Sequence, residues 1–106
     1  HASHWSRPYD VDFGTMRGQS VLGQSAFLQS LGTILMEEGA SNLSQDYFAA
    51  ATNQTVTKFV AALGVPAIQL EINSVWLLGI GNAVQEHNVA AMLQALVRFV
   101  RTVRRP

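Results

Sequence analysis

Residues 65–72 read VPAIQLEI, and this stretch decides the fold class that the sequence predicts. A run of about eight residues dense in apolar side chains is typical of a buried strand. A helical pattern at 54–63 precedes it, and Gly64 ends that helix. A helix, a one-glycine turn and a buried strand together indicate a parallel α/β connection.

The segments on either side add a second strand and two more helices. Val11 and Phe13 alternate with acids, which predicts a short strand that Gly14 stops. Apolar residues recur at three- and four-residue spacing over 25–38 and 85–103, which predicts a helix in each range. The buried stripe expected for the 54–63 helix consists of Val56, Phe59, Val60 and Leu63.

The remaining segments show no periodic pattern. Residues 1–9 are polar and aromatic and are expected to form a loop or extended arm, and loops are also expected at 40–52 and 73–85. The predicted fold class is therefore α/β: a partial three-layer αβα arrangement with a short, mostly parallel sheet and three helices. Such a sheet has edge strands with unpaired backbone N–H and C=O groups, which can pair with another strand.

The composition indicates that this chain has too few charged residues to cover its own surface. Charged residues make up 13% of the chain, against roughly 25% in soluble domains. We therefore expect a missing segment or a partner subunit to cover part of residues 1–106. These residues form a single domain or the C-terminal portion of a larger α/β hydrolase domain, and a homo-oligomer is expected.

Charge and cysteine content exclude several classes of protein. The formal net charge is zero, so binding to nucleic acid is not expected. No apolar run approaches the roughly 20 residues of a membrane span. The absence of cysteine excludes a disulfide framework and a thiolate metal site. With no signal peptide, a cytoplasmic location is expected.

Glu71 is the strongest candidate for chemistry. It is an acid within the apolar strand, near the carboxyl end where ligand sites of α/β sheets lie. Alternation places Gln69 on the same face, so a small-molecule sensor built on this pair is one possible function. Burial would suit Glu71 to general base catalysis, and a structural glutamate bonded to backbone or arginine is the equal alternative.

Histidine and arginine offer weaker signals. His1, His4 and His87 are possible imidazole ligands, but their spacing is not that of a compact metal site. Arg17 lies between glycines in a loop, where it could bind a substrate carboxylate through two hydrogen bonds or simply be solvated.

The order of these segments resembles the N-formylglutamate amidohydrolase family. The stretches that carry the resemblance are RPYDVDFGTMRGQS, GVPAIQLEIN and MLQALVRFVR, and it covers most of residues 7–104. The resemblance implies a fold similar to zinc carboxypeptidases and hydrolysis of N-acyl amino acids. It also implies that Glu71 activates a zinc-bound water, that Asn73 shapes the pocket and that His1 is the last zinc ligand. Arg17 is displaced from the arginine of the family pattern.

The implied zinc site is incomplete, because the family's first pair of zinc ligands has no counterpart in this chain. The hypothesis is therefore the C-terminal portion of a zinc-dependent amidohydrolase acting on N-formyl amino acids, inactive alone, with zinc bound only if the missing ligands are supplied. The alternative hypothesis is a stand-alone α/β oligomeric binding module without catalysis.

Overall fold

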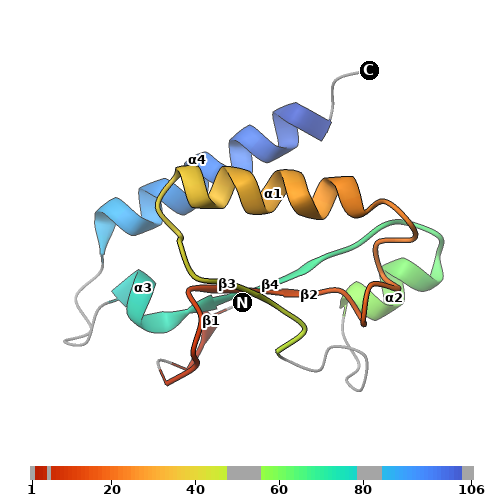
Figure 1. Ribbon diagram of the computed structural model, residues 1–106, viewed down its shortest axis with the longest axis horizontal. Helices are drawn as coiled ribbons and strands as arrows, with labels where there is room; N and C mark the ends of the chain where they lie inside the picture. Colours follow the sequence, from red (N-terminus) through yellow and green to blue (C-terminus); the bar gives the residue numbers. More distant parts are fainter. Residues whose placement is uncertain (1, 5, 48–55, 79–84, 104–106) are drawn as a thin grey trace.

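The computed structural model describes residues 2–4, 6–47, 56–78 and 85–103. Among these residues a single mixed sheet carries helices at one face and at its ends (Figure 1). The elements in chain order are β1 (Ala2–Ser3), β2 (Val11–Gly14), α1 (Ser25–Glu37), β3 (Leu43–Gln45), α2 (Val56–Ala62), β4 (Gln69–Asn73), α3 (Ser74–Leu78) and α4 (Glu86–Val103).

The sheet has the strand order β1-β4-β2-β3. The central strands β2 and β4 are antiparallel, with Val11 opposite Ile72 and Asp12 opposite Glu71. The outer strands are parallel to their neighbours, β1 to β4 and β3 to β2. Two segments that are far apart in the sequence thus form the centre of the sheet.

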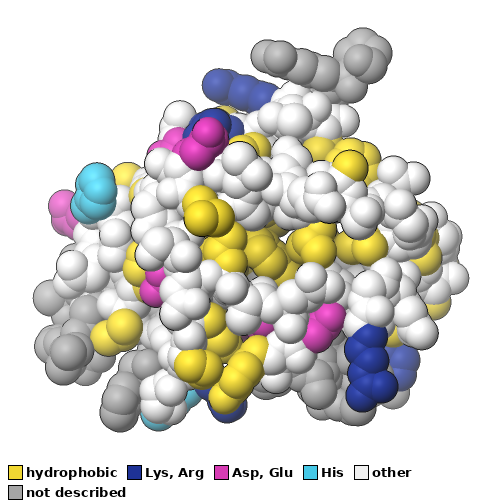
Figure 2. Space-filling view, in the orientation of Figure 1, with side chains coloured by type: hydrophobic (Ala, Val, Ile, Leu, Met, Phe, Trp, Pro, Cys, Tyr) yellow, Lys and Arg dark blue, Asp and Glu magenta, His cyan; other side chains and the backbone are white. Residues whose placement is uncertain are grey.

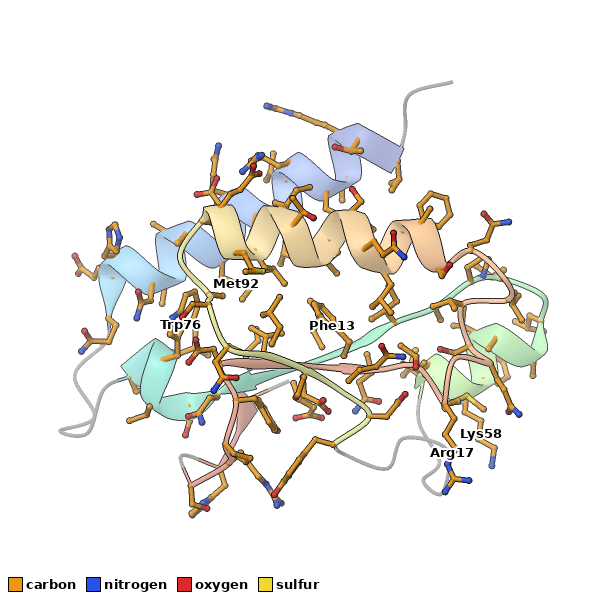
Figure 3. All side chains as sticks on the ribbon, viewed as in Figure 1. Phe13, Arg17, Lys58, Trp76 and Met92 are labelled. Carbon is orange, nitrogen blue, oxygen red and sulfur yellow. The ribbon has the colours of Figure 1, made fainter. Side chains whose placement is uncertain are left out.

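The apolar core lies between this sheet and the two long helices. Figure 1 shows α1 and α4 on the same side of the sheet, and Figure 3 shows Phe13 and Met92 pointing into the layer between them. Strand alternation sends Val11 and Phe13 to that side, since successive side chains of a strand point to opposite faces. The buried core cluster comprises Val11, Phe13, Leu31, Ile34, Leu35, Ala40, Met92 and Ala95.

A polar contact ties α4 to the end of α1. The Arg98 guanidinium donates to Glu37 Oε1 at 2.7 Å and to Glu38 Oε1 at 2.9 Å. These hydrogen bonds raise the pKa of Arg98 above its ordinary value, and the bond to Glu37 has the larger effect. The contact therefore fixes the crossing of the two helices with a guanidinium that stays charged at physiological pH.

The α/β class is confirmed, and several details differ from the prediction. The central strand pair is antiparallel, and both long helices cover one face, so the described helices form one layer there instead of two enclosing layers. Residues 43–45 form a strand and residues 74–78 a helix where loops were predicted. The predicted strand at 65–72 pairs only from Gln69 onward, and the described chain contains four helices where three were predicted.

The prediction that an apolar stripe of the 54–63 helix is buried is wrong. Val56 is 79% exposed, and Phe59 and Leu63 are each 67% exposed. Figure 1 shows α2 beyond the end of the sheet, away from the core between α1, α4 and the strands. None of the described helices is both long enough and apolar enough to cross a membrane.

Candidate functional site: a buried carboxylate pair

The face of the sheet opposite the helices carries two buried acids. Asp12 is fully buried and Glu71 is 2% exposed. They face each other across the antiparallel pair. The backbone N–H of Asn73 donates to Asp10 O at 2.8 Å, so the alternate pair of Asp12 and Glu71 is also of the hydrogen-bonded type. The Cα atoms in such a pair are about 5.5 Å apart, which brings both carboxylates to one place on the face.

Neutral donors orient both carboxylates. Ser44 Oγ, from the neighbouring strand β3, donates to Asp12 Oδ1 at 2.7 Å, and the Tyr47 N–H donates to the same atom at 3.1 Å. Gln69 Nε2 donates to Glu71 Oε1 at 2.9 Å. The last contact confirms that Gln69 and Glu71 share a face. These hydroxyl and amide donors fix the orientation of the two carboxylates.

Tyr9 adds a buried hydroxyl beside the pair. Its ring meets the ring of Tyr47 edge-on, with centroids 5.5 Å apart, and the backbone of Tyr47 is bonded to Asp12. Tyr9 is 2% exposed, and its hydroxyl has no hydrogen-bond partner among the described residues. A buried hydroxyl without a partner costs about 1–3 kcal/mol. Tyr9 therefore carries a buried polar group that the described residues leave unpaired.

Asn73, predicted to shape the pocket, holds the backbone at one end of this face. Its Nδ2 donates to Arg7 O and Tyr9 O, both at 3.0 Å. Its Oδ1 accepts from the Val75 N–H at 2.8 Å, which caps the first turn of α3. These bonds give Asn73 a clear structural role, because they join the segment that carries Tyr9 to the end of β4.

Arg17, predicted to bind substrate, lies at the other end of β4. The loop that carries it follows Gly14, which is opposite Gln69. Thr15 anchors this loop, because its N–H and its hydroxyl both donate to the Asp46 carboxylate, at 2.7 and 2.6 Å. Arg17 is exposed, with a positive φ of 57°. Figure 3 shows it pointing away from the side of the sheet that α1 covers.

Glu71 therefore lies between the two predicted substrate residues. Gln69 and Asn73 mark the ends of β4, and four residues of strand span about 13 Å. The structure brings Asp12 to Glu71, which sequence reasoning missed. The available signal was the alternation of Asp12 with Val11 and Phe13, which places that acid on the face away from the core.

The described residues do not by themselves fit a zinc ion. His1, the predicted ligand, lies outside the described residues. His4 is exposed with Nδ1 2.6 Å from Ser6 Oγ, and His87 is exposed on α4, a helix that covers the other face. Across the described part of the chain no group of three metal-binding side chains occurs. Structural and catalytic zinc sites generally use nitrogen or sulfur ligands, whereas this face offers two carboxylates.

A groove of ≈ 400 Å³ lies on the helix side of the sheet, separate from the carboxylates. Its walls come from α1, α4 and the segment that leads into β4, and Leu70 points into it from the strand. Figure 2 shows hydrophobic side chains gathered between α1 and the sheet on the viewed face. This groove is apolar, so it offers a space for hydrocarbon and not for the chemistry of Glu71.

The candidate site is therefore a pair of buried carboxylates on the polar face of a mixed sheet. Comparisons with protein-family models, curated proteins and solved structures found no match to this chain. The resemblance to N-formylglutamate amidohydrolases therefore stays a prediction, and the function has to be argued from the site.

Proposed function

We propose that this chain supplies the carboxylate-bearing part of a hydrolase. The observation that carries the proposal is the burial of Asp12 and Glu71 directly opposite each other on the polar face. Like charges opposite each other in a sheet are destabilising, and buried acids need strong compensation. An arrangement that lowers stability at one place is typical of a functional site.

The particular activity that we propose is hydrolysis of N-acyl, and specifically N-formyl, amino acids. Two of the three stretches that resemble the amidohydrolase family contain β2 and β4, the strands that hold the pair. In the proposed reaction Glu71 accepts a proton from the attacking water and returns it to the leaving amine. Asp12 lies directly opposite Glu71 on β2 and forms the other side of the same place on the face.

Arg17 is the proposed contact for the substrate carboxylate. Gln69 and Glu71 are two residues apart on β4, which corresponds to about 7 Å. The Arg17 loop begins opposite Gln69. In the proposed complex an N-acyl amino acid lies along β4 with its acyl carbon at Glu71 and its carboxylate toward Arg17, whose guanidinium can hold it through two hydrogen bonds. Because Glu71 is 2% exposed, the groups that cover it have to move aside when the substrate binds.

In this proposal any zinc ligands would come from residues outside the described ones, such as His1. The proton transfers assigned to Glu71 need no metal ligand from the described residues. Because these residues do not hold a ligand set, we expect the 106-residue chain alone to be inactive. The proposed location is the cytoplasm, which cell fractionation would test.

Ligand binding tests the proposal without requiring turnover. The 106-residue chain would be titrated with N-formyl-L-glutamate at up to millimolar concentrations while backbone amide shifts are followed by NMR. We expect the largest shifts at Asp12, Tyr47 and Glu71. Shifts confined to the apolar groove, or no shifts at all, would overturn the proposal.

Two variants and one altered ligand sharpen this titration. Arg17→Gln and the methyl ester of the ligand should each weaken binding about tenfold, since each removes the same charge-assisted contact. Lys58→Gln is the matched control, because Lys58 is also exposed and points the same way in Figure 3. Equal loss in the Lys58 variant would argue against a specific role of Arg17.

The second candidate function is a binding module without catalysis. It is favoured by the apolar stripe of Val56, Phe59 and Leu63, which α2 presents to solvent. Stoichiometric zinc with hydrolysis of N-formyl amino acids by the protein would exclude it. A metal-free, inert assembly that binds no N-acyl amino acid would favour it.

A further inference from the structure

Helix α4 has two apolar faces, and among the described residues only one of them is packed in the core. Ala91, Met92 and Ala95 are buried, and Met92 and Ala95 belong to the core cluster with residues of β2 and α1. On the other side Leu93 is 60% exposed, Val97 44% and Val100 48%. Together with exposed Ala90 these residues make the outer seam of α4: Ala90, Leu93, Val97 and Val100.

The spacing of the outer seam is that of a coiled coil. The intervals from Ala90 to Val100 are three, four and three residues, which is the a and d pattern of a heptad repeat. The seam covers about 15 Å of helix. A helix that only covered its own sheet would need one apolar stripe, because its outer face would normally be polar. This second stripe, about one and a half heptads long, fits a short contact with another helix.

The charges at the ends of α4 favour an antiparallel second copy of the same helix. Glu86 is in the first turn and Arg101 in the last turn, and both are exposed. In an antiparallel pair the first turn of one helix lies beside the last turn of the other, so Glu86 meets Arg101 of the second copy at both ends. A parallel pair would place each residue beside its own copy and would bring like charges together.

We infer that the protein forms a homodimer through the outer seam of α4, packed antiparallel about a two-fold axis. In this arrangement Leu93 packs against Val97 of the second copy, and Ala90 against its Val100, so the a and d positions alternate across the interface. A two-fold axis through the middle of the seam makes both halves identical. The formal net charge of zero leaves little repulsion between the copies.

Sedimentation velocity over a range of protein concentrations tests the dimer. Leu93→Glu should weaken dimerisation at least about tenfold, since it places two carboxylates in the apolar seam. Phe59→Glu is the matched control: it makes the same change on the exposed stripe of α2 and should leave the dimer intact. Both side chains are largely exposed, so circular dichroism and Tm should show that both variants fold.

Three outcomes of that experiment would overturn the inference. A monomer at every concentration would assign the seam to a different partner. A dimer that resists Leu93→Glu would use another surface. If Phe59→Glu disrupts the dimer as strongly as Leu93→Glu does, the dimer depends on nonspecific association of exposed apolar surface and not on this seam.

Cross-linking tests the direction of the helices. The chain has no cysteine, so Leu93→Cys and Val97→Cys each introduce a single thiol. A mixture of the two variants should form a mixed disulfide faster than either variant cross-links with itself. Faster self-cross-linking of each variant would indicate a parallel pair and would overturn the proposed arrangement. As an independent check, Glu86→Arg and Arg101→Glu should each weaken the dimer, and the double variant should restore it.

Discussion

Glu71 and Asp12 show how far residue-level reasoning reaches. Glu71 was predicted as a candidate because it is an acid in an apolar strand, and the structure places it in a buried polar site. Asp12 was not, because its neighbour across the sheet lies far away in the sequence. Strand alternation gives the face of each acid, but it does not reveal which two strands are adjacent.

Removing one charge of the pair should stabilise the fold. Glu71→Gln keeps an oxygen that accepts from Gln69 and relieves the repulsion with Asp12. We expect the free energy of unfolding to rise by up to about 1 kcal/mol, measured with urea at neutral pH. Glu86→Gln, at an exposed site, is the control. A less stable Glu71 variant would show instead that this carboxylate is a structural anchor.

The hydroxyl of Tyr9 gives a second prediction of the same kind. Tyr9→Phe removes a buried group without a partner among the described residues and should raise the free energy of unfolding by about 1 kcal/mol. Tyr47→Phe, with a side chain that is 51% exposed, should change it little. If Tyr9 serves the bound ligand, the Phe variant should also bind N-formyl-L-glutamate more weakly, which calorimetry can measure.

Asn73 should behave in the opposite way. Asn73→Ala loses two bonds to backbone carbonyl groups and the cap of α3. We expect a loss of about 2–4 kcal/mol in the free energy of unfolding. Asn73→Asp keeps the cap acceptor but sets a buried carboxylate against the two carbonyl oxygens, so it should be at least as destabilising. A stable Asn73→Ala protein that fails to bind ligand would contradict the structural role and restore the predicted role in the pocket.

At the scale of elements, periodic segments were predicted and short ones were not. The ranges of α1 and α4 follow from long amphipathic patterns. β3 has only three residues, LSQ, and α3 only five, so neither is long enough for its pattern to repeat several times. The start of α3 depends on the Asn73 cap, which sequence reasoning had assigned to a pocket. Strand direction is not encoded in local pattern, which explains the unpredicted antiparallel centre.

A matched pair of phenylalanines, one on β2 and one on α2, measures how much burial contributes to the stability of the fold. Phe13 is 5% exposed in the core, whereas Phe59 is 67% exposed on α2. Phe13→Ala should cost about 3–5 kcal/mol of stability, and Phe59→Ala less than about 0.5 kcal/mol. Chemical denaturation of both variants checks this. A large loss at Phe59 would mean that α2 is packed against something in solution.

At the scale of the whole molecule, the shortage of charged residues and the exposed apolar stripes have the same origin. With 13% charged residues the chain cannot cover its surface with charge. Helix α2 displays side chains that were expected to be covered, and α4 displays Leu93, Val97 and Val100. The composition therefore predicted that apolar surface would be left over, although it could not say where. The positions became clear only when the core had been filled by other residues.

The solubility of the protein should depend on the same shortage of charge. Because the formal net charge is zero at pH 7, we expect solubility to be lowest near neutral pH and to rise on either side of it. Precipitation by polyethylene glycol at several pH values measures this directly. The double variant Phe59→Glu and Leu63→Glu should shift the minimum to lower pH, since it adds negative charge at exposed sites. Solubility that does not change with pH would contradict the expectation.

The alternation along β2 and β4 also constrains how the chain folds. If β2 slid past β4 by one position, Asp12 would turn toward Leu35 and Met92, and Val11 would turn toward the face that carries Glu71. Burying an acid in hydrocarbon costs several kcal/mol, so the misaligned strand pair is strongly disfavoured. The acids thus help to set the strand alignment, because α1 and α4 cannot cover a misaligned pair without enclosing Asp12 in the core.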